Sequence, residues 1–335
     1  MTIATVRMSH GSGKGQQELL SSVILPALGL SKTAALEDAF VFDLPGRRLA
    51  FTTDSFVVSP LEFPGGDMGK LAACGTINDL AMMGARAILL SVGLICEEGL
   101  DIAVLTRMLS SLSSVCASMN ARIACGDTKV VDRGHVDSLF INTSGIGIVQ
   151  VGVSLSAGNA RSGDAVIVSG GIGLHGITVL AQRQNLHFAS SAVSDCAPLW
   201  GLVKALLDAV PQVRVLRDAT RGGLAAVLNE IALSSHVSIL IHEASVPVPD
   251  VVRGACAFLG MDPLHIANEG RFAAIVPAEC RDKALAALRS LPDGRDACVI
   301  GYVVEQERFP VLCNTAVGGT RPVEMPPGEL LPRIC

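Results

Sequence analysis

Short apolar runs that alternate with amphipathic stretches constrain most strongly what this chain of 335 residues can fold into. The longest apolar runs lie at 87–96 and 165–174 and are ten residues each. A helix that spans a membrane needs about 20 apolar residues, whereas a buried strand needs far fewer. Because 50% of the residues are hydrophobic and only 17% are charged, the chain can bury a large core. The pattern therefore predicts an α/β protein with buried strands.

The first half of the chain is expected to contain one amphipathic helix and three strands. Apolar residues recur every three or four positions through 101–119, which is typical of a helix. That helix should end at Asn120, because asparagine tolerates the left-handed backbone that closes many helices. The strands are expected at 49–53, 87–95 and 140–151.

A polar segment at 154–162, poor in bulky apolar residues, indicates a linker. The pattern beyond it predicts strands near 165–169, 237–241, 272–276 and 299–304 and helices at 198–210, 224–234 and 280–291. Domains average about 150 residues, so the length also favours two of them. We expect a first domain at 1–153, a second at 160–322 and a flexible tail at 323–335.

Charge and composition argue against several classes of protein. The net charge of −5 and the pI near 5.8 do not suit a nucleic-acid surface. A single Trp and a single Tyr do not suit a stacking platform for single strands. The mean hydropathy is high, at +0.48, yet the chain has no spanning run and no basic leader before an apolar segment. We therefore expect a cytoplasmic protein that binds neither nucleic acid nor membrane.

The cysteines suggest buried, reduced thiols. Ten are scattered along the chain without any C-x-x-C pair, and a structural zinc site needs paired ligands. Several lie in apolar surroundings, as Cys74 and Cys298 do. A cysteine in such a setting behaves as a small hydrophobic residue.

One cysteine is different, because Cys335 is the final residue printed and follows a proline-rich segment. Residues 325–334 include three prolines and a glycine. Such a segment cannot easily join a helix or a central strand. The thiol is therefore either a substrate carrier on a mobile arm or a stray cysteine on a frayed end.

Five aspartates lie at strand ends or in glycine-rich segments, and these are Asp38, Asp54, Asp79, Asp127 and Asp218. Carboxylates in such settings suit Mg²⁺, which takes hard oxygen ligands and is often shared with substrate phosphates. Each one alone is more often a helix cap or a turn residue. Together, in a chain with few charges, they favour a site for a metal and a nucleotide.

Glycine-rich segments offer further contacts for phosphates. Gly222 and Gly223 precede an expected helix, whose first N–H groups can bind an anion. The segment 10–15, HGSGKG, is either a flap that carries Lys14 over phosphates or a disordered start. The P-loop motif GxxxxGK(S/T) is absent from the sequence.

Several motifs together closely resemble the HypE family, the carbamoyl dehydratases of NiFe-hydrogenase maturation within the PurM-like superfamily of ATP-dependent enzymes. The matching segments run almost from end to end of the chain. These segments are HGSGKG (10–15), FTTDSFVVSPLEFPGGDMGKLA (51–72), LFINTSGIG (139–147), RDATRGGLA (217–225), ANEGR (267–271), CGTINDLAMMGA (74–85), GDTKVV (126–131) and PRIC (332–335). The combination of the last three is highly specific.

The resemblance implies a two-domain PurM-like architecture of the α/β (α+β) class. The first domain would have a mixed, barrel-forming sheet and would form a homodimer, and the second would be an α/β domain. The implied reaction is the ATP-dependent dehydration of an S-carbamoyl group on Cys335 to a thiocyanate. That product would supply the cyanide ligands of the hydrogenase iron. The implied cofactors are ATP and Mg²⁺.

The resemblance also assigns roles to residues around that chemistry. Lys129 would stabilise a phosphate or carbamoyl oxygen, and Glu269 would act as the base toward the nitrogen. The alternative for these two residues is a mutual ion pair on the surface. Contacts with Mg²⁺–ATP would come from Asp38, Asp54, Asp79, Asp127, Asp218 and Lys14, of which Asp38, Asp79 and Asp218 would bind the metal.

The implied partners are the carbamoyltransferase HypF, which would load Cys335, and the HypC–HypD iron-assembly complex, which would receive the cyanide. Two departures from the family pattern bear on the site: Lys14 interrupts the glycine loop, and Leu174 replaces an aspartate in the GDHG turn. The family's acidic pair appears here as Glu37–Asp38. Any role of the replaced aspartate is lost here, and either member of the acidic pair could bind the metal.

Two other functions remain open. One is another PurM-like ATP-dependent synthetase, which makes selenophosphate or closes a purine precursor ring; neither reaction predicts the terminal PRIC. The other is a non-catalytic metallochaperone or scaffold that uses Cys335 as a soft-metal ligand. That function predicts further cysteines or histidines beside Cys335.

Overall fold

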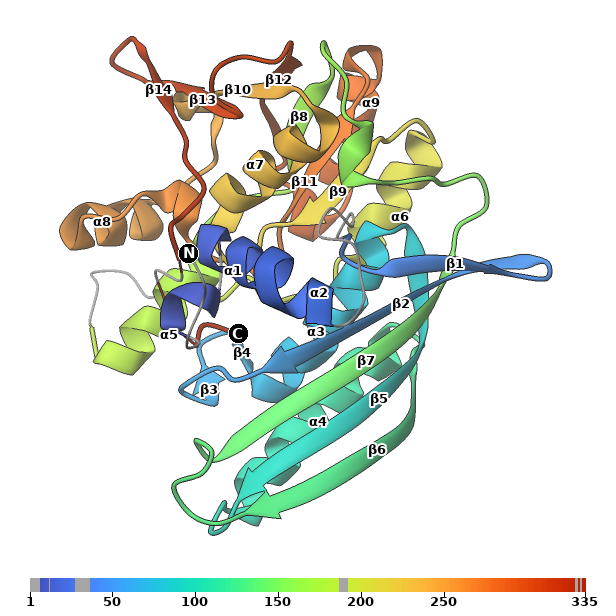
Figure 1. Ribbon diagram of the computed structural model, residues 1–335, viewed down its shortest axis with the longest axis vertical. Helices are drawn as coiled ribbons and strands as arrows, with labels where there is room; N and C mark the ends of the chain where they lie inside the picture. The colour runs from blue at the N-terminus through green and yellow to red at the C-terminus, as the bar shows by residue number, and fades with distance from the viewer. Residues whose placement is uncertain (1–6, 12, 28–36, 187–191, 329–330, 332) are drawn as a thin grey trace.

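The computed structural model in Figure 1 describes residues 7–11, 13–27, 37–186, 192–328, 331 and 333–335. Part of the expected glycine-rich flap, at residue 12, and parts of the expected tail, at 329, 330 and 332, lie outside the described residues. Within the described part of the chain, no helix is both long and apolar enough to cross a membrane.

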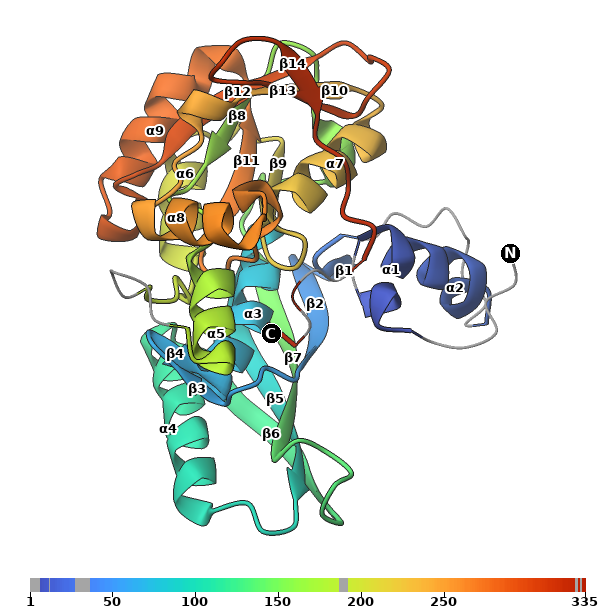
Figure 2. The same cartoon turned by 90° about the vertical axis from the view of Figure 1, so that its left-hand side faces the viewer.

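The first sheet has five strands in the order β1-β2-β7-β5-β6. Its strands are β1 (Phe40–Leu44), β2 (Arg47–Phe56), β5 (Ala85–Glu97), β6 (Arg122–Val131) and β7 (Leu139–Val149). All neighbours are antiparallel except β5 and β6, which are parallel and joined through helix α4 (Ile102–Ser118). Helices α3 (Met68–Met82) and α4 cover one face of this sheet (Figure 2).

Helix α4 shows how the sequence determines these elements. Asp101 caps it by accepting a hydrogen bond from the backbone N–H of Ala103 at 2.7 Å. Met108, Leu112 and Cys116, spaced four residues apart, are its buried residues. Asn120 lies just beyond the helix with φ of 54°, so the predicted helix and its left-handed stop are confirmed.

The second sheet has seven strands in the order β14-β13-β10-β12-β8-β11-β9. They are β8 (Ala165–Val168), β9 (Val215–Asp218), β10 (Ser238–His242), β11 (Phe272–Val276), β12 (Cys298–Val304), β13 (Val311–Asn314) and β14 (Thr320–Pro322). Helix α7 (Gly223–Ser235) packs on one face, whereas α6 (Trp200–Ala209) and α9 (Arg281–Arg289) pack on the other.

The remaining elements are shorter or peripheral. They are the α-helices α1 (Gly13–Leu19), α2 (Leu25–Ala27), α5 (Leu174–Gln184) and α8 (Asp250–Leu259), the hairpin strands β3 (Glu62–Phe63) and β4 (Gly66–Asp67), and the short helices η1 (Met8–Gly11), η2 (Leu20–Ile24), η3 (Ala157–Asn159), η4 (Glu243–Ser245), η5 (Pro263–His265), η6 (Ala278–Cys280) and η7 (Pro292–Gly294). Helices α1 and α2 extend sideways from the rest of the molecule (Figure 2).

The two halves of the chain share one apolar core. A continuous cluster of buried side chains runs from α3 and the first sheet to α6, α9 and one face of the second sheet. Asn78 of α3 links the halves as well: its side chain donates to the carbonyl of Ala197 at 3.1 Å and accepts from the N–H of Leu199 at 2.7 Å. The two sheets lie on either side of the expected linker, while the domain bounds 1–153, 160–322 and 323–335 stay a prediction.

The crossing of α3 and α4 generates a stability prediction. A Cβ on Gly69 would lie 1.8 Å from the carbonyl oxygen of Met108, so Gly69→Ala should push the two helices apart. We expect it to lower the free energy of unfolding by about 1–3 kcal/mol, as overpacking typically does. Urea unfolding measures the change. Gly254→Ala is the control, because a Cβ on that helical glycine would meet nothing within 4 Å. An equal loss of stability in both variants would contradict the close approach of α3 and α4 at Gly69.

Candidate active site

A cavity of about 470 Å³ lies between the two halves of the chain. The first half contributes side chains from β2 and α3, and the second contributes the end of β9, the turn after it and the start of α7. Glu269 and Cys335 also line the cavity. Residues that the sequence separates widely therefore converge on one space.

Three of the predicted aspartates form a compact cluster in this cavity. Asp38 precedes β1, Asp79 lies on α3 and Asp218 ends β9, yet each offers a carboxylate oxygen within 4.8 Å of the others. Thr52 donates a hydrogen bond to Asp79 Oδ2 at 2.8 Å. Asp54 lines the same cavity. The structure thus brings together the three residues that were expected to bind a metal.

The carboxylates of the cluster are costly to ionise where they lie. Burial raises the pKa of Asp79 well above its usual value, and the charges of Asp54, Asp218 and Asp38 raise it further. Burial likewise raises the pKa of Asp38, although Arg217 opposes the shift. The pKa of Asp218 rises to about 6, again chiefly through burial. Carboxyl groups at this spacing therefore hold protons strongly, and a positive charge between them would favour their ionised forms.

The cluster has the ligands that a hard divalent cation requires. Asp38 Oδ2 is buried and has no hydrogen-bond partner among the described residues. The three carboxylates can converge on one point, and one of their oxygens has no partner. This arrangement fits Mg²⁺, which binds through few carboxylates and is also bound by the phosphate oxygens of a substrate. The donor set contains no sulfur or imidazole, so it does not resemble a zinc site.

The geometry distinguishes the two members of the acidic pair. Glu37 accepts hydrogen bonds from the hydroxyl of Ser156 and from the N–H of Ala157 at 3.1 Å, so it caps η3 in the linker. Asp38 instead faces the cluster and pairs with Arg217 at 3.3 Å. Arg217 also pairs with Glu230 at 2.7 Å. Asp38 is therefore the member that is placed to bind a cation.

The turn after β9 provides positive charge and backbone N–H groups. Gly222 and Gly223 have φ of 79° and 61°. A Cβ on Gly223 would lie 2.6 Å from the carbonyl oxygens of Ile266 and Leu264, so only glycine fits there. Arg221 is exposed and lines the cavity. Helix α7 begins here, and its N-terminus can receive a phosphate.

The tail lies in the cavity wall. Cys335 is only 9% exposed, and its backbone carbonyl accepts a hydrogen bond from the N–H of Val57 at 3.1 Å. The carbonyl of Arg333 accepts from the N–H of Ser59 at 3.3 Å. The described tail residues are therefore docked against the segment after β2, whereas the sequence suggested a mobile arm or a frayed end.

Glu269 is buried and lines the same cavity as Cys335. It is 3% exposed, and its Oε1 has no hydrogen-bond partner among the described residues. Burial raises the pKa of Glu269 well above its usual value, and the charges of Cys196, Asp218 and Asp195 add to the shift. A carboxylate in such surroundings binds a proton strongly. The alternative of a surface ion pair with Lys129 is not seen within the chain, where Glu269 is buried and Lys129 pairs with Asp127 at 2.7 Å.

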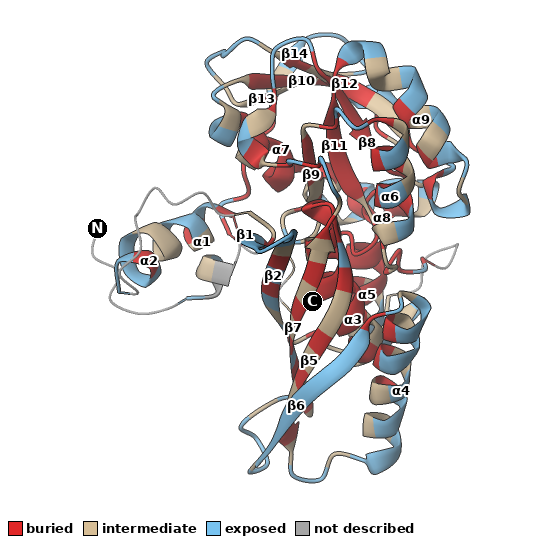
Figure 3. Ribbon diagram, turned by 90° about the vertical axis from the view of Figure 1, so that its right-hand side faces the viewer, coloured by how far each residue is buried: buried red, intermediate tan, exposed pale blue. Residues whose placement is uncertain are grey.

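Three predicted residues do not reach this cavity in the single chain. Asp127 and Lys129 lie on β6, whose residues are almost all exposed (Figure 3). Lys14 pairs with Glu324 at 3.7 Å on the surface. None of these three is among the described residues that line the cavity.

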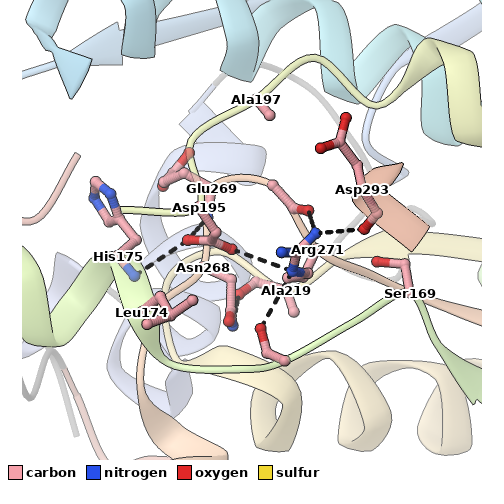
Figure 4. A network of polar contacts seen from close by, with 12 residues as sticks. Ser169, Leu174, His175, Asp195, Ala197, Ala219, Asn268, Glu269, Arg271 and Asp293 are labelled. Atoms are coloured by element: carbon pink, nitrogen blue, oxygen red, sulfur yellow. Dashed lines mark hydrogen bonds and ion pairs between the residues drawn. The ribbon is translucent and has the colours of Figure 1, made fainter. Parts of the chain in front are cut away.

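Sequence reasoning also missed several residues of this site. Arg217 and Arg221 flank the predicted Asp218, and the mixed-charge run RDATR was the available signal. His175 lies in the turn that the family writes GDHG, but nothing in the sequence joins it to Ile334, 159 residues away. Asp195 had no signal, and Figure 4 shows its carboxylate hydrogen-bonded to the backbone of His175. Leu174, which stands where the family has an aspartate, begins α5.

Comparisons with known proteins agree with this geometry. Residues 36–149 match the AIR synthase related protein N-terminal domain, and residues 161–314 match the corresponding C-terminal domain. The carbamoyl dehydratase HypE of Rhodobacter capsulatus is 46% identical over 334 residues, which cover 98% of each chain. The chain belongs to the HypE family of carbamoyl dehydratases. It is therefore an enzyme with the PurM-like, two-domain α/β architecture that the sequence predicted.

Solved structures of HypE proteins support the same assignment. The HypE of a HypE–HypF complex superimposes with a TM-score of 0.87 at 44% identity, over 92% of this chain and 99% of that one. A HypE in complex with ATP superimposes with a TM-score of 0.83 at 44% identity, over 99% of this chain and 100% of that one. The family consists of hydrogenase maturation proteins.

The acidic cluster generates a prediction for the metal-free protein. Because the pKa values are raised in the folded state, the cluster stabilises the fold at low pH, where its carboxyl groups are protonated. This contribution is lost as the pH rises through about 6, the pKa of Asp218, and through the pKa values of the other two aspartates. Asp79→Asn removes one of the buried charges. We expect it to raise the unfolding temperature in a chelator at about pH 7.5, and to raise it less at about pH 5.

The matched control is Asp296→Asn, which changes an exposed aspartate. Its effect should be small at both pH values. Calorimetry measures the six transitions of the wild type and the two variants at both pH values. A pH-independent effect of Asp79→Asn would show that charge repulsion in the cluster does not destabilise the fold.

Proposed function

We propose that this chain dehydrates an S-carbamoyl group on its own Cys335 to a thiocyanate, with ATP as the phosphoryl donor. The observation that supports this proposal is the convergence of Cys335, Glu269 and the three-aspartate cluster on one cavity. A thiol carrier, a proton acceptor and a cation site are the parts that such a reaction requires. The proposal makes Cys335 a carrier and not a stray thiol.

The reaction divides into phosphoryl transfer and elimination. The carbonyl oxygen of the thiocarbamate attacks the γ-phosphorus of ATP, ADP leaves, and the nitrogen loses one proton, which gives an S-bound O-phosphoimidate. The remaining N–H proton is then removed as the C–O bond breaks and phosphate leaves, which gives the S–C≡N group. Glu269, buried with a free oxygen, is the candidate acceptor for these protons.

Asp38, Asp79 and Asp218 would hold Mg²⁺. The cation, when bound, neutralises the charge of the phosphates during transfer. Asp54 lies beside the cluster, and Arg221 and the N-terminus of α7 face the same cavity. These groups position phosphates and exclude water more than they take part in covalent chemistry.

The other substrates and partners follow from this chemistry. A HypF-type carbamoyltransferase would load the thiol, as the HypE–HypF complex of a relative suggests. A HypC–HypD-type iron-assembly complex would take the cyanide. The use of ATP and the ten cysteines kept as thiols suit the reducing cytoplasm, where we place the reaction.

A second copy of the chain would complete the site. The cavity is lined by seven carboxylates and two arginines within the described residues, and by no lysine. Strand β6, an edge strand that exposes Ile123 and Val130 as well as Lys129, is suited to pairing with another copy. We propose that a homodimer formed through this sheet brings Lys129 and Asp127 to the cavity of the partner.

Cys335→Ala should abolish the reaction without preventing the fold. The variant should bind ATP, because the acidic cluster is intact, but it should acquire neither a carbamoyl group nor a cyanide. Intact mass after incubation with the carbamoyltransferase, carbamoyl phosphate and ATP measures both adducts. Cys313→Ala, which changes another buried cysteine, is the control and should keep both. An adduct that persists in Cys335→Ala would assign the carrier to a different thiol.

Glu269→Gln and Lys129→Ala should separate loading from dehydration. Each should accept the carbamoyl group and then lose water at least about 100-fold more slowly, the lower end of general-base contributions. The mass of the adduct over time distinguishes the two steps. Normal thiocyanate formation in Glu269→Gln would remove it from the reaction.

Mixing these two variants also tests the homodimer. If Lys129 acts on the cavity of the partner, a mixed dimer contains one cavity with both residues intact, and dehydration should return. If the mixture stays inactive although mixed dimers form, Lys129 does not act in the partner's site.

A further inference from the structure

We propose that His175 is a positioning residue that sets how far the tail enters the cavity, and so places the Cys335 thiol beside Glu269. This inference rests on the proposed function, because it concerns the same dehydration. His175 itself touches no reacting atom. It acts through the backbone carbonyl of Ile334, which its Nε2 contacts at 2.8 Å.

The hydrogen bonds of the tail leave one carbonyl for His175. Val57 and Ser59 donate to the carbonyls of Cys335 and Arg333 at 3.1 and 3.3 Å. The carbonyl of Ile334 lies between these two, and its partner is the imidazole of His175. The tail is therefore held from both sides over its last three residues.

The neighbours of His175 fix which nitrogen carries the proton. The carbonyl of Ile334 can only accept a hydrogen bond, so Nε2 carries the hydrogen and donates it. Nδ1 of the neutral ring then accepts from the hydroxyl of Ser194 at 2.8 Å, and the oxygen of that hydroxyl accepts from the N–H of Cys196 at 3.1 Å. Burial lowers the pKa of His175 below its usual value, which favours this neutral ring.

Asp195 connects this histidine to the candidate base (Figure 4). Its Oδ1 accepts the backbone N–H of His175 at 3.1 Å and that of Glu269 at 3.3 Å. One carboxylate oxygen thus fixes both the residue that holds the tail and the residue that would remove the protons. A change in either backbone would shift the tail relative to Glu269.

Packing leaves this contact little freedom. His175 is 0% exposed and Ile334 is 2% exposed. The edge of the imidazole meets the ring of Phe63, with the centroids 5.3 Å apart. By contrast, the ion pair of Arg333 with Asp137 lies toward solvent and should contribute less to the position of the tail.

The test compares His175→Phe with His175→Gln in the full-length protein. Phenylalanine fills the space of the ring but cannot donate to Ile334, whereas the glutamine amide can. Loading of Cys335 by the carbamoyltransferase should be unchanged in both. Conversion of the carbamoyl adduct to the cyanide adduct, followed by intact mass, should slow about tenfold or more in His175→Phe, as expected when a buried carbonyl loses its donor, and should recover largely in His175→Gln.

A second readout does not depend on the proposed chemistry. The rate at which iodoacetamide alkylates Cys335 in the unloaded protein, mapped by peptide mass, should rise several-fold in His175→Phe. His265→Phe is the matched control, because His265 contacts the tail at the carbonyl of Glu324, far from the thiol. It should change neither rate.

These readouts separate the two ideas. If the wild type never loses water from its adduct, the proposed function fails, and alkylation alone then decides the role of His175. Unchanged alkylation and conversion in His175→Phe would overturn the inference, as would equal effects in His265→Phe. If His175→Phe does not fold, Ser194→Ala replaces it, since it leaves the ring but removes the partner that orients it; a wild-type result there would also overturn the inference.

Discussion

Buried negative charge between the two halves of the chain is the constraint on which the rest of this structure depends. Asp38 and Asp79 come from the first half and Asp218 from the second, yet their oxygens lie within 4.8 Å of one another. Arg217 compensates only part of this charge, because it is shared with Glu37 and Glu230. A cation in the cluster would bind ligands from both halves. The shared apolar core is therefore a requirement of the site, since it keeps the three carboxylates together.

The same interface also holds the tail and the candidate base. Asn78 of α3 donates toward the carbonyl of Glu269 at 3.4 Å as well as that of Ala197, and Asp79 is the next residue of that helix. The helix that positions a cluster aspartate thus lies directly against the loop of the base. Glu269 and the cluster can be held at a fixed separation without any contact between them. A flexible hinge at this place would lose the geometry of both.

Much of this arrangement could be predicted from the sequence, and the failures have physical causes. Helix α4 was found because only one stripe of it is buried, whereas α3 was missed because nearly all its residues are buried and no stripe remains. The cluster aspartates were found from residue type and setting. Strand β6 was missed because Gly126 and Asp127 are poor strand formers, and its pairing with β5 overrides that preference. His175 could not be found, since Ile334 lies 159 residues away.

Charge balance also decides what this cavity can accept. Seven carboxyl groups face two arginines among the described residues that line it, so the cavity repels a free nucleoside triphosphate whenever these groups are ionised. A nucleotide that shares a divalent cation with Asp38, Asp79 and Asp218 avoids this repulsion, because the cation neutralises both sides. The group that we propose on Cys335 has the opposite requirement. A carbamoyl or cyanide group on sulfur is uncharged, so it can enter and leave the acidic cavity without a change in its charge. A neutral group carried on a thiol is therefore well matched to a site that is kept negative for a metal–nucleotide complex.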